Sequence, residues 1–185
     1  GGQPRTAKDA VFGASPHPGN LHALISRWLN PLQGGVLPVG TFHCGDQINV
    51  TAGKATLSGI VRAFNDETKE QILGRMKQIC DGIAIAYECG IDMKVKYMYP
   101  PLLNDCGLFE QVKEILGERF VPAEKVMLAE DFAYYTKELP SLFMFLGFAE
   151  ESGIRYPLHS TKFDFDEHIL LNGMQAYLDI ANTIF

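Results

Sequence analysis

The sequence predicts a mixed fold, in which an α+β region is followed by an α/β region, and three observations lead to this. Residues 20–99 have the pattern helix, strand, strand, helix, strand, which places two helices on one face of an antiparallel sheet. The Pro100-Pro101 pair then marks a boundary. Beyond it, short helices alternate with apolar strand-like runs, as in α/β proteins. We therefore expect an irregular lead-in over residues 1–19, a first domain over 20–101 and a second over 102–185.

The elements of the first domain follow from its periodicity. Asn20 precedes apolar residues at helical spacing and predicts a helix to about residue 30. Asn65 caps a second helix that runs from Glu67 to about Cys89 and ends at Gly90. A complete βαββαβ unit would need a further strand before the first helix, which residues 1–12 supply poorly. Three runs of β-branched, aromatic or alternating residues predict strands: Val36–Cys44, Ala55–Phe64 and Met93–Tyr99.

The second domain contains one strongly apolar run between helices. Ser141–Phe148 is apolar on both faces, as in a strand in the middle of a parallel sheet. Asp164 and Glu167 form a capping box for a terminal helix. Helices are predicted over Leu108–Leu116, from Glu130 to about Leu139, and from Ile169 to Phe185.

Composition excludes several classes of protein. The net charge of −6 and the scattered Lys and Arg argue against a nucleic-acid partner. No stretch is long and apolar enough to span a bilayer, and no signal peptide is visible, so we expect a cytoplasmic protein without a membrane partner. Four cysteines without C-x-x-C spacing suit free thiols in a reducing compartment: Cys44, Cys80, Cys89 and Cys106.

His159 is the first candidate for chemistry, because it lies in a loop just before the terminal helix. A loop histidine that only hydrogen-bonds to a neighbour is the simpler interpretation. A small metal site is a weaker alternative, although the acids nearby suit helix caps better than ligands. It would combine four residues of one stretch: His159, Asp164, Asp166 and His168.

The Glu130–Asp131 pair and Arg62 have two interpretations each. Glu130 and Asp131 are a carboxylate pair for metal or acid–base work, or simply acids at a helix N-terminus. Arg62 ends an alternating strand and presents a forked donor to a carboxylate, or pairs with Asp66 at a solvated strand end. Asn49 lies in the turn before that strand.

Several motifs together resemble the M20 metallopeptidase family, and its aminoacylase, hippurate hydrolase and auxin-conjugate amidohydrolase branch in particular. Asn49-Val50 with Leu57-x-Gly59-x-Val61-Arg62 is similar to the signature of that branch's lid, or dimerisation, domain. The resemblance runs from about Leu24 to Phe185. The second-domain motifs are Met127-Leu128-Ala129-Glu130-Asp131-Phe132, Phe145-Leu146-Gly147 and Leu158-His159-Ser160-x-x-Phe163-Asp164-x-x-Glu167.

The resemblance implies a ferredoxin-like lid and the C-terminal part of an α/β catalytic domain. It implies that His159 is the last ligand of a two-metal site of zinc, manganese or cobalt, and that Asn49 and Arg62 hold the substrate's carboxylate. Gly147 lines the cleft, and Glu130 and Asp131 have a supporting role. The implied partners are an N-acyl amino acid or small peptide as substrate and a second copy of the chain, bound through the lid.

The family's other metal ligands and its general base lie in a half that this chain does not match. The resemblance therefore implies a metal-dependent amidohydrolase that is inactive and holds no tightly bound metal as this chain alone, with no catalytic residue of its own to assign. The alternative is a non-catalytic dimerisation or regulatory module derived from such an enzyme.

Overall fold

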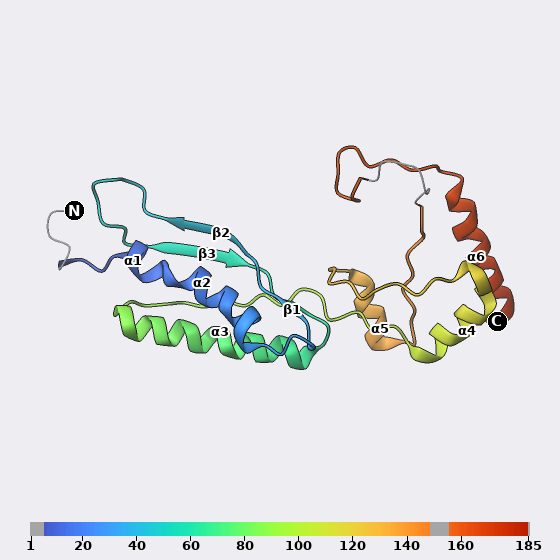
Figure 1. The fold of residues 1–185 in the computed structure, drawn as a ribbon, viewed down its shortest axis with the longest axis horizontal. Coiled ribbons are helices and arrows are strands. Elements are labelled where there is room, and N and C mark those ends of the chain that lie inside the picture. Colours follow the sequence, from blue (N-terminus) through green and yellow to red (C-terminus); the bar gives the residue numbers. More distant parts are fainter. Residues whose placement is uncertain (1–5, 149–155, 185) are drawn as a thin grey trace. The chain divides into compact units, whose positions relative to one another are not determined.

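The structure is a computed structural model in which residues 6–148 and 156–184 are described, and the chain divides into two compact units (Figure 1). The first unit comprises Gly1–Pro101 and Val126–Glu130, and the second comprises Leu102–Lys125 and Asp131–Phe185. Both contain helices, and the first also contains short antiparallel strands. The mixed α+β and α/β class predicted from the sequence is confirmed.

The strands of the first unit form an interrupted antiparallel ribbon. β1 (Gly35–Val36) pairs with β4 (Arg62–Ala63), and β2 (Val39–Cys44) pairs with β3 (Ala55–Gly59). The sequence predicted one continuous strand on each side. Both break at the same level because Pro38 has no N–H to donate, and because the ladder is irregular between Val39 and Thr41.

Three helical segments accompany this ribbon. α1 (Ala10–Ala14) and α2 (Pro16–Ala23) continue into a π-helical turn, Leu24–Trp28. The predicted irregular lead-in over residues 1–19 is therefore wrong from residue 10 onward. Pro16 stands at the first position of α2, where a helix needs no N–H donor, so the Pro- and Gly-rich composition does not prevent a helix here.

The long helix α3 (Asp66–Tyr87) begins as predicted, because the Asn65 side chain accepts a hydrogen bond from the Thr68 N–H at 2.8 Å. Its end differs from the prediction, since Glu88, not Gly90, adopts the left-handed conformation (φ 50°). Lys8 forms an ion pair with Glu88. The core between α2, the π turn, the ribbon and α3 is Leu21, Leu24, Leu29, Leu37 and Ile72.

The second unit is built from short helices and extended chain. Asp105 caps α4 (Cys106–Leu116), and Gly117 (φ 55°) ends it, as predicted. A 3-10 turn (Gly117–Arg119) follows α4. The predicted helix over residues 130–139 is a 3-10 turn (Asp131–Tyr134) followed by α5 (Tyr135–Glu138). The last helix is α6 (Ile169–Ile184), whose Gly173 lies against Leu146.

Two predicted strands are wrong in the described part of the chain. Residues 93–99 and 141–148 are extended but belong to no strand ladder. The second run is instead fixed at its start, where Asn104 exchanges two hydrogen bonds with Phe143 and the Asp105 N–H donates to the Ser141 carbonyl at 2.8 Å. A strand needs a hydrogen-bonded neighbour, and apolar sequence alone does not supply one.

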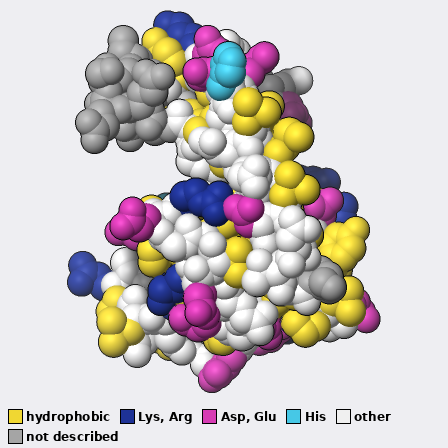
Figure 2. Space-filling model, turned by 90° about the vertical axis from the view of Figure 1, so that its right-hand side faces the viewer, with side chains coloured by type: hydrophobic (Ala, Val, Ile, Leu, Met, Phe, Trp, Pro, Cys, Tyr) yellow, Lys and Arg dark blue, Asp and Glu magenta, His cyan; other side chains and the backbone are white. Residues whose placement is uncertain are grey.

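Apolar side chains remain exposed on the second unit. Figure 2 shows one face of the molecule, on which hydrophobic side chains lie among charged ones. The large exposed apolar residues of α6 are Leu170, Leu171, Met174, Tyr177 and Leu178.

No helix within residues 6–148 and 156–184 has both the length and the apolar character to cross a bilayer.

Candidate functional site

His159 lies in a tight turn, where the Ser160 N–H donates to the Pro157 carbonyl at 2.8 Å. Its side chain is exposed. The turn leaves the imidazole accessible to solvent, and the described contacts do not bury it. The position agrees with the expectation of a loop residue before the last helix, but does not by itself assign a role.

The acids after His159 serve the start of α6, although not as predicted. Asp166, instead of Asp164, accepts hydrogen bonds from the His168 N–H at 3.0 Å and from the His168 ring at 2.8 Å. These hydrogen bonds lower the pKa of Asp166 below its usual value. The Asp164 carboxylate accepts from the adjacent Phe165 N–H. The predicted Asp164–Glu167 capping box is therefore wrong.

The weaker hypothesis of a small metal site in this stretch is also not supported. Within the described residues, no group of three or more His, Cys, Asp or Glu side chains is arranged to hold a metal ion. His168 and Asp166 are paired with each other, and His159 is a single exposed imidazole. The described residues do not fit a metal pair on their own, because a metal centre needs about three converging protein ligands.

An aromatic cluster connects the His159 loop to the segment that carries Gly147. Phe148 packs edge-on against Phe163 with ring centroids 5.2 Å apart, and Phe165 lies 6.0 Å from Phe148. Gly147 is exposed, and a Cβ added there would meet no heavy atom within 4 Å. The structure thus joins the motif that contains Gly147 to the motif that contains His159, through contacts of Phe148 that the sequence does not predict.

Asn49 and Arg62, which the resemblance assigns to one carboxylate, are not brought together. Asn49 is exposed in the turn between β2 and β3, whereas Arg62 lies in β4, beyond the opposite end of β3 (Figure 1). The five residues of β3 alone span about 15 Å at the usual rise of a strand. Within one copy of the chain, the two side chains do not converge on one small ligand.

Arg62 has a defined partner. Its half-buried guanidinium donates from Nη1 to the backbone carbonyl of Met127. Asp66, the partner that the simpler interpretation gave to Arg62, accepts from Lys69 Nζ at 2.6 Å. The hydrogen bond between Arg62 and Met127 could not be predicted from the local sequence, because 65 positions separate the donor from the acceptor.

Glu130 and Asp131 are divided between the units. Glu130 is the last residue of the segment that packs with the first unit, and Asp131 opens the 3-10 turn of the second. Glu130 is half-buried and Asp131 is exposed. The pair therefore marks a crossing of the chain from one unit to the other.

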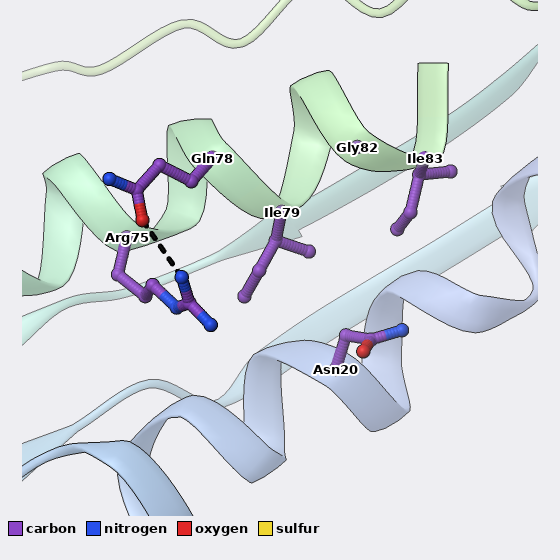
Figure 3. Close-up of a pocket in the computed structure, with 6 residues that line it drawn as sticks. All are labelled: Asn20, Arg75, Gln78, Ile79, Gly82 and Ile83. Atoms are coloured by element: carbon purple, nitrogen blue, oxygen red, sulfur yellow. Dashed lines mark hydrogen bonds between the residues drawn. The ribbon is translucent and has the colours of Figure 1, made fainter. Parts of the chain in front are cut away.

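A shallow groove lies between α2 and α3 and has a volume of about 240 Å³. Figure 3 shows Asn20 on α2 opposite Ile79 and Ile83 on α3, and Arg75 Nη1 donating to Gln78 Oε1 at 2.9 Å. None of the residues that line this groove is a His, Cys, Asp or Glu. It lacks the groups that acid–base or metal chemistry needs, so it is not the candidate active site.

The family model that matches residues 5–183 is that of peptidase family M20/M25/M40, and the chain belongs to this family. It is 34% identical over 178 residues to an N-acetyldiaminopimelate deacetylase of Enterococcus faecalis, which covers 94% of this chain and 46% of that protein. A protein of the same name from Oenococcus oeni is 29% identical over 180 residues, again covering 94% of this chain and 46% of that protein. The chain thus spans about half the length of the curated relatives it matches.

Two solved structures have the same fold. A putative aminohydrolase from methicillin-resistant Staphylococcus aureus superimposes with a TM-score of 0.85 at 33% identity, over 97% of this chain and 47% of that one. A Bacillus subtilis protein described as a dinuclear metal binding peptidase from the M20 family gives 0.77 at 25% identity, over 94% and 45%. The resemblance to M20 enzymes drawn from sequence motifs is confirmed.

Proposed function

We propose that the protein containing this chain hydrolyses the amide bond of an N-acyl amino acid or small peptide. The observation that carries the proposal is the 34% identity to an N-acetyldiaminopimelate deacetylase, which extends over 178 residues and so includes both units. The substrate class follows from that relative's name, in which the bond broken joins an acyl group to an amino acid.

In this proposal, His159 supplies one imidazole ligand to a divalent metal centre such as zinc, manganese or cobalt. Its exposed position in a turn supports the role, because an exposed imidazole is accessible to a metal ion. The remaining ligands have to come from outside the described residues, which hold no suitable cluster. When bound, a divalent metal polarises a carbonyl and lowers the pKa of a bound water.

The other positions have roles that do not involve the metal. Asn49, exposed at the end of the β2–β3 hairpin, donates its amide to the substrate's carboxylate. Gly147 leaves open space beside the Phe148 cluster, where a side chain would narrow a cleft. Glu130 and Asp131 support the site. A homodimer formed through the first unit remains a prediction.

The test measures metal content and amine release together, on the full-length protein loaded with zinc or manganese and supplied with N-acetyl amino acids. We expect His159→Ala to reduce bound metal and to slow hydrolysis by about 100-fold or more, as loss of a ligand should do at least as strongly as loss of a group that orients one. His168→Ala is the matched control, because this second histidine of the same stretch is exposed and alanine keeps the backbone N–H that donates to Asp166 at the start of α6.

Two outcomes would contradict the proposal. Undiminished metal content and activity in His159→Ala would exclude the ligand role. Absence of hydrolysis by the metal-loaded wild-type protein on N-acyl amino acids and dipeptides would favour the alternative, a dimerisation or regulatory module.

A further inference from the structure

The loop that carries His159 has no regular secondary structure, since residues 156–168 form neither helix nor strand. Two hydrogen-bonded turns meet at Ser160, which is half-buried. Its N–H donates to the Pro157 carbonyl at 2.8 Å, and its carbonyl accepts from the Phe163 N–H at 3.1 Å. Because these turns tie His159 closely to Phe163, a shift of the Phe163 ring would move the backbone that carries the imidazole.

Aromatic side chains attach this loop to Phe148. Phe163 and Phe165 are half-buried, whereas Asp164 between them is exposed. The Phe148 ring packs edge-on against Phe163 with centroids 5.2 Å apart and lies 6.0 Å from Phe165, and the two loop rings are 5.7 Å from each other. Aromatic pairs prefer edge-to-face and offset arrangements, so these contacts favour one placement of the loop over others.

Phe148 lies at the end of an extended run that the second unit holds at two places. Asn104 exchanges two hydrogen bonds with the backbone of Phe143 at the start of the run. Close to Phe148, Leu146 packs against α6 at Gly173, where a Cβ would lie 3.2 Å from Leu146 Cδ2. The ring of Phe148 therefore projects from a fixed segment, against which the loop can be held.

We infer that Phe148 is a positioning residue, which acts through Phe163 to hold the turn that carries His159. Its ring contacts both half-buried aromatic side chains of the loop, so truncating it removes two contacts at once. The consequence for catalysis rests on the proposed function, in which a misplaced imidazole slows the reaction. The attachment of the loop rests on the contacts alone.

The attachment is tested on the full-length protein by limited trypsin cleavage at the bond between Lys162, which is exposed, and Phe163. We expect Phe148→Ala to speed this cleavage roughly tenfold, because the loop has to open for cleavage and two aromatic contacts that oppose opening are lost. The substitution leaves the cleaved bond itself unchanged. Phe148→Tyr keeps the ring and should retain most of the protection.

Phe120→Ala is the matched control, because the Phe120 ring is also half-buried in the second unit and packs edge-on against Phe109 at 5.2 Å. It should speed cleavage after Lys113, an exposed residue of α4, and leave cleavage after Lys162 unchanged. Equal cleavage after Lys162 in the wild type and in Phe148→Ala would overturn the attachment. Parallel acceleration after both lysines in Phe148→Ala would do so as well, because it would mean general loss of structure.

Circular dichroism shows whether each variant is folded. If Phe148→Ala does not fold, Phe148→Leu takes its place, because leucine keeps an apolar side chain but removes the ring. Faster cleavage after Lys162 is expected for this variant too, and a wild-type rate would overturn the attachment.

The positioning role is tested by a double-mutant cycle on the full-length protein, with N-acetyl amino acids as substrates. We expect Phe148→Ala to lower kcat about tenfold when His159 is present, and by less than about twofold when it is replaced by alanine. A residue that acts through another has little further effect once that one is removed. Phe148→Tyr should keep a kcat close to that of the wild type.

Equal losses of kcat in the two backgrounds would overturn the positioning role, because they would show that Phe148 does not act through His159. Unchanged kcat in Phe148→Ala would also overturn it. If the wild type hydrolyses no N-acyl amino acid, the proposed function fails, and the cleavage experiment still decides whether Phe148 holds the loop.

Discussion

Replacing Ile72 with alanine should destabilise the first unit by about 4 kcal/mol, in the upper part of the range for buried isoleucine truncations. Ile72 is the most deeply buried side chain of the core, with 0% of its surface exposed. It belongs to the same buried cluster as Leu29 and Leu37.

The magnitude is high because the site cannot collapse. The Ile72 Cδ1 atom lies 2.8 Å from where a Cβ on Gly35 would stand, so part of the wall is bare backbone of β1. Leu29 Cδ2 lies at the same distance from that point. A backbone held in a strand pair cannot move in to fill a cavity, and a residual cavity adds to the cost of truncation.

Equilibrium urea unfolding followed by tryptophan fluorescence measures the change. Trp28 is the single tryptophan of the sequence and belongs to the first unit, with the Arg75 guanidinium 5.7 Å from its ring. With a slope of about 2 kcal/mol per molar urea, the midpoint should fall by about 2 M. Ile72→Val should cost only about 1 kcal/mol.

Ile85→Ala is the matched control, since Ile85 lies on the same helix with 81% of its surface exposed. Its effect should stay within about 0.5 kcal/mol, as for most surface substitutions. Similar midpoint shifts for Ile72→Ala and Ile85→Ala would refute the core as described, because burial would then not determine the cost.

Two further predictions concern a buried hydroxyl and an exposed carboxylate. Thr68 is 1% exposed, and its Oγ1 has no hydrogen-bond partner among the described residues. Thr68→Val should therefore stabilise the first unit by about 1 kcal/mol in the same urea assay. A loss of stability would instead reveal a partner for the hydroxyl. Hydrogen bonds from Arg119 and Gln175 hold the pKa of Asp179 below its usual value, so Arg119→Gln should raise that pKa in a carboxyl NMR titration. Because the folded pKa is the lower one, this carboxylate contributes stability above its unfolded-state pKa and loses it as pH falls through the folded pKa. The stabilities of wild type and Arg119→Gln should therefore converge in acid, and a constant difference down to low pH would contradict the assignment.

Features set by nearby residues could be predicted from the sequence. Asn65 caps α3 three residues ahead of the N–H it accepts from, and Gly117 ends α4 in a positive-φ conformation. Helical spacing also placed Leu21, Leu24 and Ile72 on the faces that form the core. In each case the donor, the acceptor or the apolar period lies within a few positions along the chain, where local physical chemistry decides.

Features that depend on distant partners could not be predicted in the same way. Alternation in residues 93–99 indicates two different faces but does not say which strand, if any, lies alongside. The left-handed residue that ends α3 is Glu88, whereas the sequence predicted Gly90. Glu88 forms an ion pair with Lys8, eighty positions away. The predicted lead-in failed for a different reason. Residues 1–19 are rich in Gly, Pro and Ala and lack a clear periodicity, but Pro16 is compatible with the first position of a helix.

The candidate site shows the same division between local and distant information. The motifs indicated the family, but a motif assigns a role by position, and position does not reveal what a side chain contacts. Arg62 illustrates this, because a forked donor at the end of a strand predicts a carboxylate partner, whereas in the structure its Nη1 donates to the main-chain carbonyl of Met127. The proposed role of His159 therefore depends on partners outside the described residues, whereas the contact of Arg62 with Met127 is present in the fold but assigns no role by itself.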